Sequence, residues 1–230
     1  EGENFNGGSV IYQLTPSLGP GNLNYSNSDY DIRNNLVGDL VYEEPYKWSS
    51  HIANYLAGGW VVGAKTYWRS GEPYSLNNND VIADYTNLSP TTLMVDLAPG
   101  VSVSQLDNLA PSDPKYCGYG NPCLSLAQFN ANQADLGTLR RNALEGPHYS
   151  DTDISLLKHI VKGERYAFSL GANAYNVFNH VNFAPPNGNI GLSNFGTISS
   201  AVAPPTSPYG SFQGAAVTQR LLVVHGKFTF

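Results

Sequence analysis

The stretch Gln219–Phe230, with the sequence QRLLVVHGKFTF, decides the fold. Successive side chains of a β-strand face opposite sides of its sheet. One side of this stretch carries Val224 and Phe228, whereas the other carries His225 and Lys227. A tilted strand needs about 9–11 residues to cross a bilayer, and strands of outer-membrane barrels alternate in this way. The stretch therefore predicts a membrane-spanning strand whose polar side lines a barrel lumen.

The same alternation recurs at residues 36–43, 60–69, 151–158 and 166–177, and it is weakest in the first of these stretches. Strands of soluble sandwiches are shorter, at about 5–6 residues. The sequence therefore predicts an all-β fold, namely an antiparallel transmembrane β-barrel portion of about five or six strands. Seven polar residues of these stretches are expected to face the lumen: Lys65, Arg69, Asp151, Asp153, Asn173, His225 and Lys227.

The connections between the predicted strands alternate between short and long. In outer-membrane barrels the short turns face the periplasm and the long loops face outside. Residues 1–34, 70–150 and 178–218 are therefore expected to form external loops, and residues 1–230 as a whole to form one C-terminal barrel part. In one short connection, Ser49 or Ser50 is expected to cap a short helix that runs through Leu56.

The composition limits which partners the chain can bind and in which cellular compartment it is expected. Only 13% of the residues are charged and the net charge is −6, which argues against nucleic acid as a partner. Cys117 and Cys123 enclose a short Gly-, Asn- and Pro-containing segment, and a disulfide between them is favoured over half of a zinc site. A soluble secreted β-sandwich shares this composition and stays open as an alternative.

No grouping of residues predicts catalysis. The five histidines show no metal-ligand spacing, and neither a nucleophile elbow nor a phosphate-binding loop occurs in the sequence. The stretch Asn77–Asp80 is expected to be a solvated loop rather than a Ca²⁺ site, because it lacks the ligand pattern of a calcium loop. We therefore expect no enzyme activity, no cofactor and no bound metal.

Five strands are too few for a closed barrel, because bacterial single-chain barrels have an even number of strands from eight upward. An open sheet edge cannot lie in lipid, where its backbone groups would find no hydrogen-bond partners. The sequence therefore predicts that further barrel strands, from the same protein or from other chains, complete the structure. The start at Glu1, without Met or a signal peptide, is expected of a mature, processed or partial chain.

A series of motifs, in order along the chain, resembles the late barrel of Oar-like TonB-dependent receptors of the Acidobacteria type. The motifs are Asn22–Asn34, Leu40–Glu43, Leu56–Trp60, Ser70–Tyr74, Arg140–Pro147, Asp151–Lys158, Gly163–Arg165, Ala174–His180 and Lys227–Phe230. The chain departs from the family in strand 166–177, where Gly171 and Asn173 stand at positions that often carry a charge. The cysteine pair has no place in the family pattern.

The resemblance implies a bacterial outer-membrane protein with extracellular loops, which takes up a nutrient such as a carbohydrate or a peptide. It also implies a plug, the remaining barrel strands, the energy-coupling protein TonB and outer-membrane lipid as partners. Phe228 and Phe230 are similar to the terminal aromatic signal that the barrel-assembly machinery reads. Two alternatives stay open: a structural or adhesive surface protein, and a soluble carbohydrate-binding sandwich.

Overall fold

A computed structural model of the chain describes residues 26–44, 49–78, 93–106, 122–130, 137–162, 165–202 and 219–230. The chain divides into two compact units. We call residues 34–69, 149–181 and 218–230 the sheet unit, and residues 1–33, 70–148 and 182–217 the loop unit. Each unit is described by itself.

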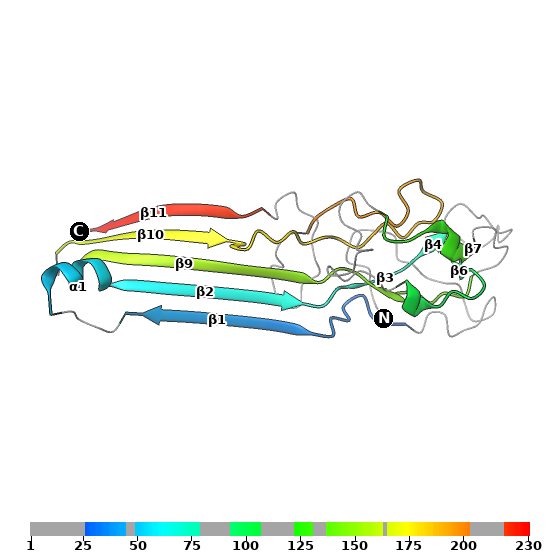
Figure 1. Cartoon of the computed structure of the whole chain (residues 1–230), viewed down its shortest axis with the longest axis horizontal. Helices are drawn as coiled ribbons and strands as arrows, with labels where there is room; N and C mark the ends of the chain where they lie inside the picture. Colours follow the sequence, from blue (N-terminus) through cyan, green and yellow to red (C-terminus); the bar gives the residue numbers. More distant parts are fainter. Residues whose placement is uncertain are drawn as a thin grey trace. The chain divides into compact units, whose positions relative to one another are not determined.

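The sheet unit is built on one antiparallel sheet of five long strands, which Figure 1 shows side by side. In sheet order the strands are β1 (Asn35–Glu43), β2 (Trp60–Arg69), β9 (Tyr149–Lys162), β10 (Ala167–Tyr175) and β11 (Leu221–Thr229). The predicted all-β antiparallel class is confirmed. The segment before β1 and the two long connections, β2 to β9 and β10 to β11, all join the sheet at the same end. Arg69 pairs with both Asn35 and Tyr149, and Ala174 at the end of β10 pairs with Ile154 near the start of β9.

The bounds of two strands differ from those expected. The strand predicted at 151–158 extends over 149–162, and the strand predicted at 166–177 covers only 167–175. The register between β9 and β10 shifts at Phe168/Ser169, because Phe168 pairs with Val161 whereas Ser169 pairs with His159. Ile160 is thus an extra residue, and such a bulge breaks the two-residue alternation while the strand continues. The turn expected from His159 onward therefore begins after Lys162.

A short helix, α1 (His51–Ala57), lies in the connection between β1 and β2, as predicted. Ser50 is its N-cap residue, but the serine side chain makes no capping hydrogen bond. The Ser50 carbonyl oxygen accepts the first hydrogen bond of the helix, from the Asn54 amide at 2.9 Å. Among the described residues, no helix has the length and hydropathy needed to cross a membrane.

The described part of the loop unit contains three two-stranded sheets. They pair β3 (Pro73–Tyr74) with β8 (Leu144–Glu145), β4 (Asn77–Asn78) with β5 (Leu93–Met94), and β6 (Asp96–Leu97) with β7 (Phe129–Asn130). Two single-turn 3₁₀ helices, η1 (Val103–Gln105) and η2 (Leu126–Gln128), complete the regular structure. The long connections thus fold, because they carry enough apolar residues to bury.

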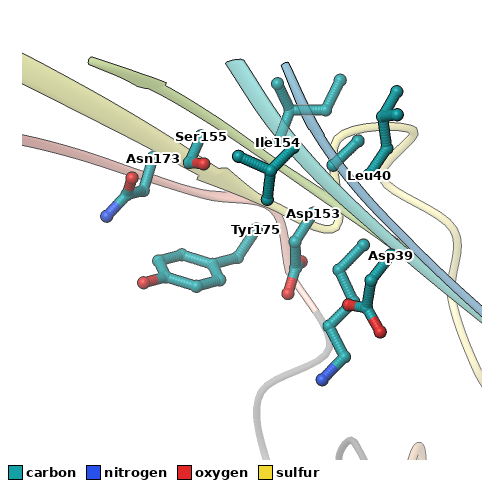
Figure 2. Close-up of a pocket in the computed structure, with 11 residues that line it drawn as sticks. Asp39, Leu40, Asp153, Ile154, Ser155, Asn173 and Tyr175 are labelled. Atoms are coloured by element: carbon teal, nitrogen blue, oxygen red, sulfur yellow. The ribbon is translucent and has the colours of Figure 1, made fainter. Parts of the chain in front are cut away.

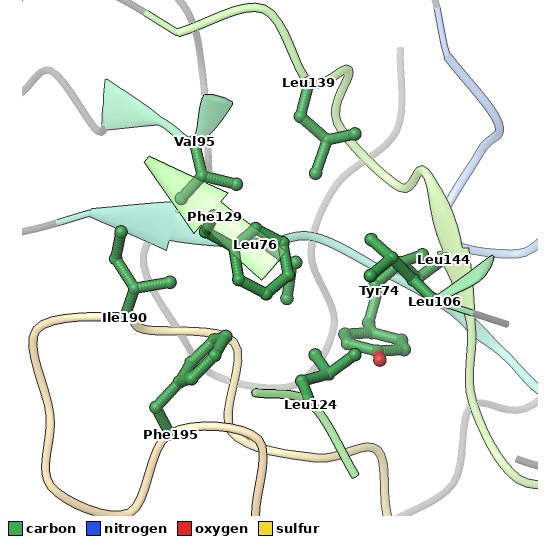
Figure 3. Close-up of a cluster of buried hydrophobic side chains, with 10 residues drawn as sticks. All are labelled: Tyr74, Leu76, Val95, Leu106, Leu124, Phe129, Leu139, Leu144, Ile190 and Phe195. Atoms are coloured by element: carbon green, nitrogen blue, oxygen red, sulfur yellow. The ribbon is translucent and has the colours of Figure 1, made fainter. Parts of the chain in front are cut away.

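These buried residues form one cluster inside the loop unit (Figure 3). Its members are Tyr74, Leu76, Val95, Leu106, Leu124, Phe129, Leu139, Leu144, Ile190 and Phe195. Phe129 and Phe195 meet edge to face, with ring centroids 5.4 Å apart. The expectation of a solvated loop at Asn77–Asp80 is wrong for its first half, because Asn77 and Asn78 form β4 and Asn78 is buried. Asn79 and Asp80 lie outside the described residues.

Candidate functional site

The register of the sheet sorts its side chains onto two faces, because residues paired across antiparallel strands point to the same side. Lys65 of β2 pairs with Asp39 of β1 and with Asp153 of β9, so these three residues share a face. We call this side the polar face. It holds all seven residues predicted to face a lumen: Lys65, Arg69, Asp151, Asp153, Asn173, His225 and Lys227.

The opposite side, which we call the apolar face, carries large apolar side chains from every strand. They include Leu36, Leu40, Tyr42, Trp60, Val62, Trp68, Ile154, Leu156, Phe168, Leu170, Leu222, Val224 and Phe228. Many of them are uncovered, and Val224 at mid-strand is 73% exposed. A continuous apolar surface of this kind marks contact with lipid or with another protein.

An open pocket of about 290 Å³ lies on the sheet around the pairing of Lys65 with Asp39 and Asp153. Ser155, Asn173 and Tyr175 add hydroxyl and amide groups to its lining. Figure 2 shows Asp39, Asp153 and Tyr175 projecting to one side of the strands, while Leu40 lies on the other. One cation between two carboxylates, together with neutral donors and acceptors, suits the binding of polar solutes.

Sequence reasoning missed several residues of this polar face. Asp39 lies in the stretch with the weakest alternation, and no sequence pattern distinguishes Tyr175 from the rest of its strand. His159, which the sequence predicts to begin a turn, belongs to β9 instead, and its Nδ1 lies 2.9 Å from the Ser169 hydroxyl oxygen. The parity of positions along β10 would have found Ser169 and Tyr175.

Two glycines make room for polar side chains on this face. A Cβ atom at Gly63 would collide with the Ser155 hydroxyl, and one at Gly171 would collide with the His225 imidazole. His225 pairs with Gly171 across the β10–β11 ladder. The space beside Gly171 is therefore occupied by a histidine from the next strand.

The turn after β10 is held by asparagines. Asn176 and Asn179 adopt left-handed backbone conformations, with φ of 47° and 53°, which Asn tolerates better than most residues. The Asn176 backbone amide donates to an Asp153 carboxylate oxygen at 3.0 Å. The Arg220 amide donates to the Asn179 side chain at 3.2 Å. Asp153 thus fixes the chain direction at the end of β10 in addition to lining the pocket.

Inside the loop unit, two of the motifs that carry the resemblance, Asn22–Asn34 and Arg140–Pro147, meet in one buried polar cluster with Ser75. Arg141 donates to the Asp29 carboxylate at 2.5 Å, and the Asn142 side chain also donates to that carboxylate. The side-chain amide of Asn142 also donates to the Asn27 backbone carbonyl oxygen at 3.0 Å. The Ser75 hydroxyl accepts from the Asn142 backbone amide and donates to its side-chain oxygen, each at 2.9 Å. The cluster joins segments far apart in the sequence.

Aromatic residues gather on the apolar face at the end where the short turns lie. The rings of Tyr166 and Phe228 stack with centroids 6.2 Å apart, and Phe228 and Phe230 stack at 6.0 Å. The Arg165 guanidinium lies 5.5 Å from the Tyr166 ring centroid. Phe228 and Phe230 are thus exposed members of an aromatic row, an arrangement typical of the girdles of membrane barrels.

The predicted disulfide stays a prediction, because Cys117 lies outside the described residues. Cys123 packs against the core cluster of the loop unit, and its backbone amide donates to the Gly196 carbonyl oxygen at 2.7 Å. Within the described ranges, no group of three or more His, Cys, Asp or Glu residues is placed to hold a metal ion.

A sheet of long strands with one polar and one apolar face has the arrangement of a membrane-barrel wall, which is polar on the inside and apolar on the outside. A family model described as an outer membrane beta barrel domain matches residues 1–213. The chain belongs to this outer-membrane β-barrel family. The match ends before β11, which joins the wall through its pairing with β10 along its whole length. A search of the curated proteins and one of the solved structures found no match.

Membership of the outer-membrane barrel family indicates which environment each face of the sheet is suited to. The apolar face is the one suited to lipid, and the polar face is the one suited to the inside of the barrel. It places the chain in the outer membrane. It also favours a membrane protein over the soluble sandwich, since the long strands form a single sheet rather than two packed ones.

Proposed function

We propose that this barrel chain is part of a TonB-dependent outer-membrane transporter that takes up a nutrient such as a carbohydrate or a peptide. The observation that carries the proposal is the polar face, where Lys65 pairs in register with Asp39 and Asp153. Charged and hydroxyl groups on a lumen wall stay hydrated and offer hydrogen bonds to a polar solute. The chain itself has no catalytic role in this proposal.

The buried polar cluster of the loop unit supports the link to Oar-like receptors. Asp29 and Asn142 come from two separate motifs of the resemblance and are hydrogen-bonded to each other. Ser75, which directly follows a third motif, is hydrogen-bonded to Asn142. Motifs that are weak one by one are therefore parts of one folded arrangement. Contact between motifs far apart in the sequence is a more specific feature than the alternation of barrel strands, because barrel strands alternate in every family.

The proposed protein needs partners beyond this chain. Among the described strands, β1 and β11 form the two edges of the sheet, and edges in lipid require hydrogen-bonded neighbours. Further barrel strands and a plug, from the same protein or from other chains, fill that role in the proposal. TonB would act on the plug, and outer-membrane lipid would cover the apolar face.

The proposal places the loop unit outside the cell. Its support is that the segment before β1 and both long connections join one end of the sheet, whereas α1 and the turn between β9 and β10 lie at the other. Long loops on one side and short turns on the other are the pattern of barrels whose turns are periplasmic.

Uptake by intact cells tests the proposal. We expect cells that lack this protein to lose accumulation of at least one radiolabelled oligosaccharide or peptide from a panel. We expect the same loss on depletion of TonB, because the energy for uptake comes through it. The matched control is a strain that carries the intact gene on a plasmid.

A different outcome would favour the alternative, in which the protein is a structural or adhesive surface component. Normal uptake of the whole panel combined with lost attachment to surfaces or to other cells would contradict the transport proposal. The folded core of the loop unit is the feature that such an adhesive role would use.

The aromatic row gives a prediction about assembly. Replacing Phe230 by Ala is expected to lower the yield of heat-modifiable protein in the outer membrane several-fold, because the barrel-assembly machinery would lose a recognised aromatic. The yield is measured by gel shift of isolated membranes. Tyr166→Ala is the matched control, since it removes a ring of the same row outside the terminal strand; equal losses would mean a general girdle effect instead.

A further inference from the structure

The helix α1 exposes large apolar side chains where a water-exposed helix would carry polar ones. Ile52, Tyr55 and Leu56 are between 61% and 74% exposed. They lie three and four residues apart and therefore share one side of the helix. Ala53 and Ala57, on another side, are half-buried. The helix sequence HIANYLA contains no Asp, Glu, Lys or Arg.

The end of the helix is fastened to side chains of the apolar face. The indole nitrogen of Trp60 donates to the Leu56 carbonyl oxygen at 2.9 Å. The Lys158 ammonium donates to the Gly58 carbonyl oxygen, and it lies 5.1 Å from the Trp60 ring centroid. Trp60 and Lys158 are register partners, so both belong to the apolar face.

These contacts make the exposed side of α1 continuous with a surface already suited to lipid. The helix lies at the end of the sheet where β2 begins, as Figure 1 shows. The aromatic row of Tyr166, Phe228 and Phe230 lies at the same end. Trp and Tyr concentrate at membrane interfaces, and a lysine there extends its ammonium toward the headgroups.

We propose that α1 is an interfacial anchor, with Ile52, Tyr55 and Leu56 inserted at the boundary between headgroups and acyl chains of the nearer leaflet. Amphipathic helices of this kind lie in the plane of the interface, about 5–10 Å deep. The occupant is lipid rather than a second protein, because the exposed side is uncharged and continues the lipid-facing surface. The proposal rests on the barrel family alone and does not depend on the transported substrate.

Spin labels on single cysteines test the anchor. The full-length protein, with Cys117 and Cys123 replaced by Ser, is reconstituted into vesicles of phosphatidylethanolamine and phosphatidylglycerol. Ile52→Cys is the test position, Asn54→Cys on the opposite, exposed side of the same helix is the matched control, and Val224→Cys reports the apolar face. Accessibility to oxygen, which dissolves in lipid, is compared with accessibility to a water-soluble nickel chelate.

We expect the labels at positions 52 and 224 to be several-fold more accessible to oxygen than to the chelate, and the label at 54 to show the reverse. A label at 52 that behaves like the one at 54, while the one at 224 reports lipid, overturns the anchor and leaves the barrel assignment intact. Labels at 52 and 224 that both report water overturn the membrane placement as well.

A second measurement keeps the native cysteines in case their replacement prevents folding. Tyr55→Trp adds a fluorophore on the exposed side of α1. Brominated lipids are expected to quench the added emission, relative to the parent protein, at least as strongly as that of the parent's own tryptophans. Added emission that brominated lipids leave unchanged overturns the anchor.

Discussion

Replacing Val224 by Arg is expected to destabilise the inserted protein by about 2–4 kcal/mol, the cost of a cation at the middle of the lipid face of a barrel. Val224 pairs with Ala172 near the centre of β11, and its side chain is among the most exposed on the apolar face. An arginine there must either leave its charge in hydrocarbon or pull water and headgroups toward it. The free energy of unfolding from lipid vesicles, measured by denaturant titration, is the readout.

The neighbouring position supplies the control. His225 lies on the polar face, where its ring fills the space above Gly171. His225→Arg places the same cation one residue along the same strand but on the side suited to water. We expect it to cost much less than Val224→Arg. Equal losses for the two variants would show that the faces of the sheet have been assigned wrongly.

Replacing Asp29 by Ala is expected to lower the local stability of the loop unit by about 3 kcal/mol, because it leaves the buried Arg141 cation without its carboxylate. The side chains of Arg141 and Asp29 are only 10% and 16% exposed. Asn142 loses an acceptor in the same step. Hydrogen exchange of the amides at 140–146 should become more than about 100-fold faster, since each 1.4 kcal/mol is a factor of ten.

Asp31 provides a matched control within two residues of Asp29. It also pairs with an arginine, Arg33, but at 3.8 Å and with side chains 36% and 61% exposed. Exposed pairs of this kind contribute about 0–1 kcal/mol. Asp31→Ala should therefore leave the exchange at 140–146 nearly unchanged. If both variants accelerate exchange alike, the cluster around Asp29 is not what holds the loop unit.

The sequence by itself determined the class of the fold and the sorting of side chains on the strands. Lys65, Asp153 and His225 were assigned to one face by counting alternate positions, and the structure places them together. This succeeds because the two-residue period is a local property of an extended backbone. The short helix is predicted for a similar reason, since its start signal, Ser49 or Ser50, lies directly before it.

Only the tertiary structure decided what depends on distant partners. The bulge at Ile160 extends β9 past the point where its alternation fails, and the pairing with β10 makes it visible. Asp29 meets Arg141 across a sequence separation of 112 residues. The loop unit has a core because apolar residues from distant segments pack together. The apolar side of α1 is exposed next to Trp60 because a hydrogen bond from Trp60 fixes the end of the helix there. No local pattern encodes such meetings, since they depend on how the whole chain packs.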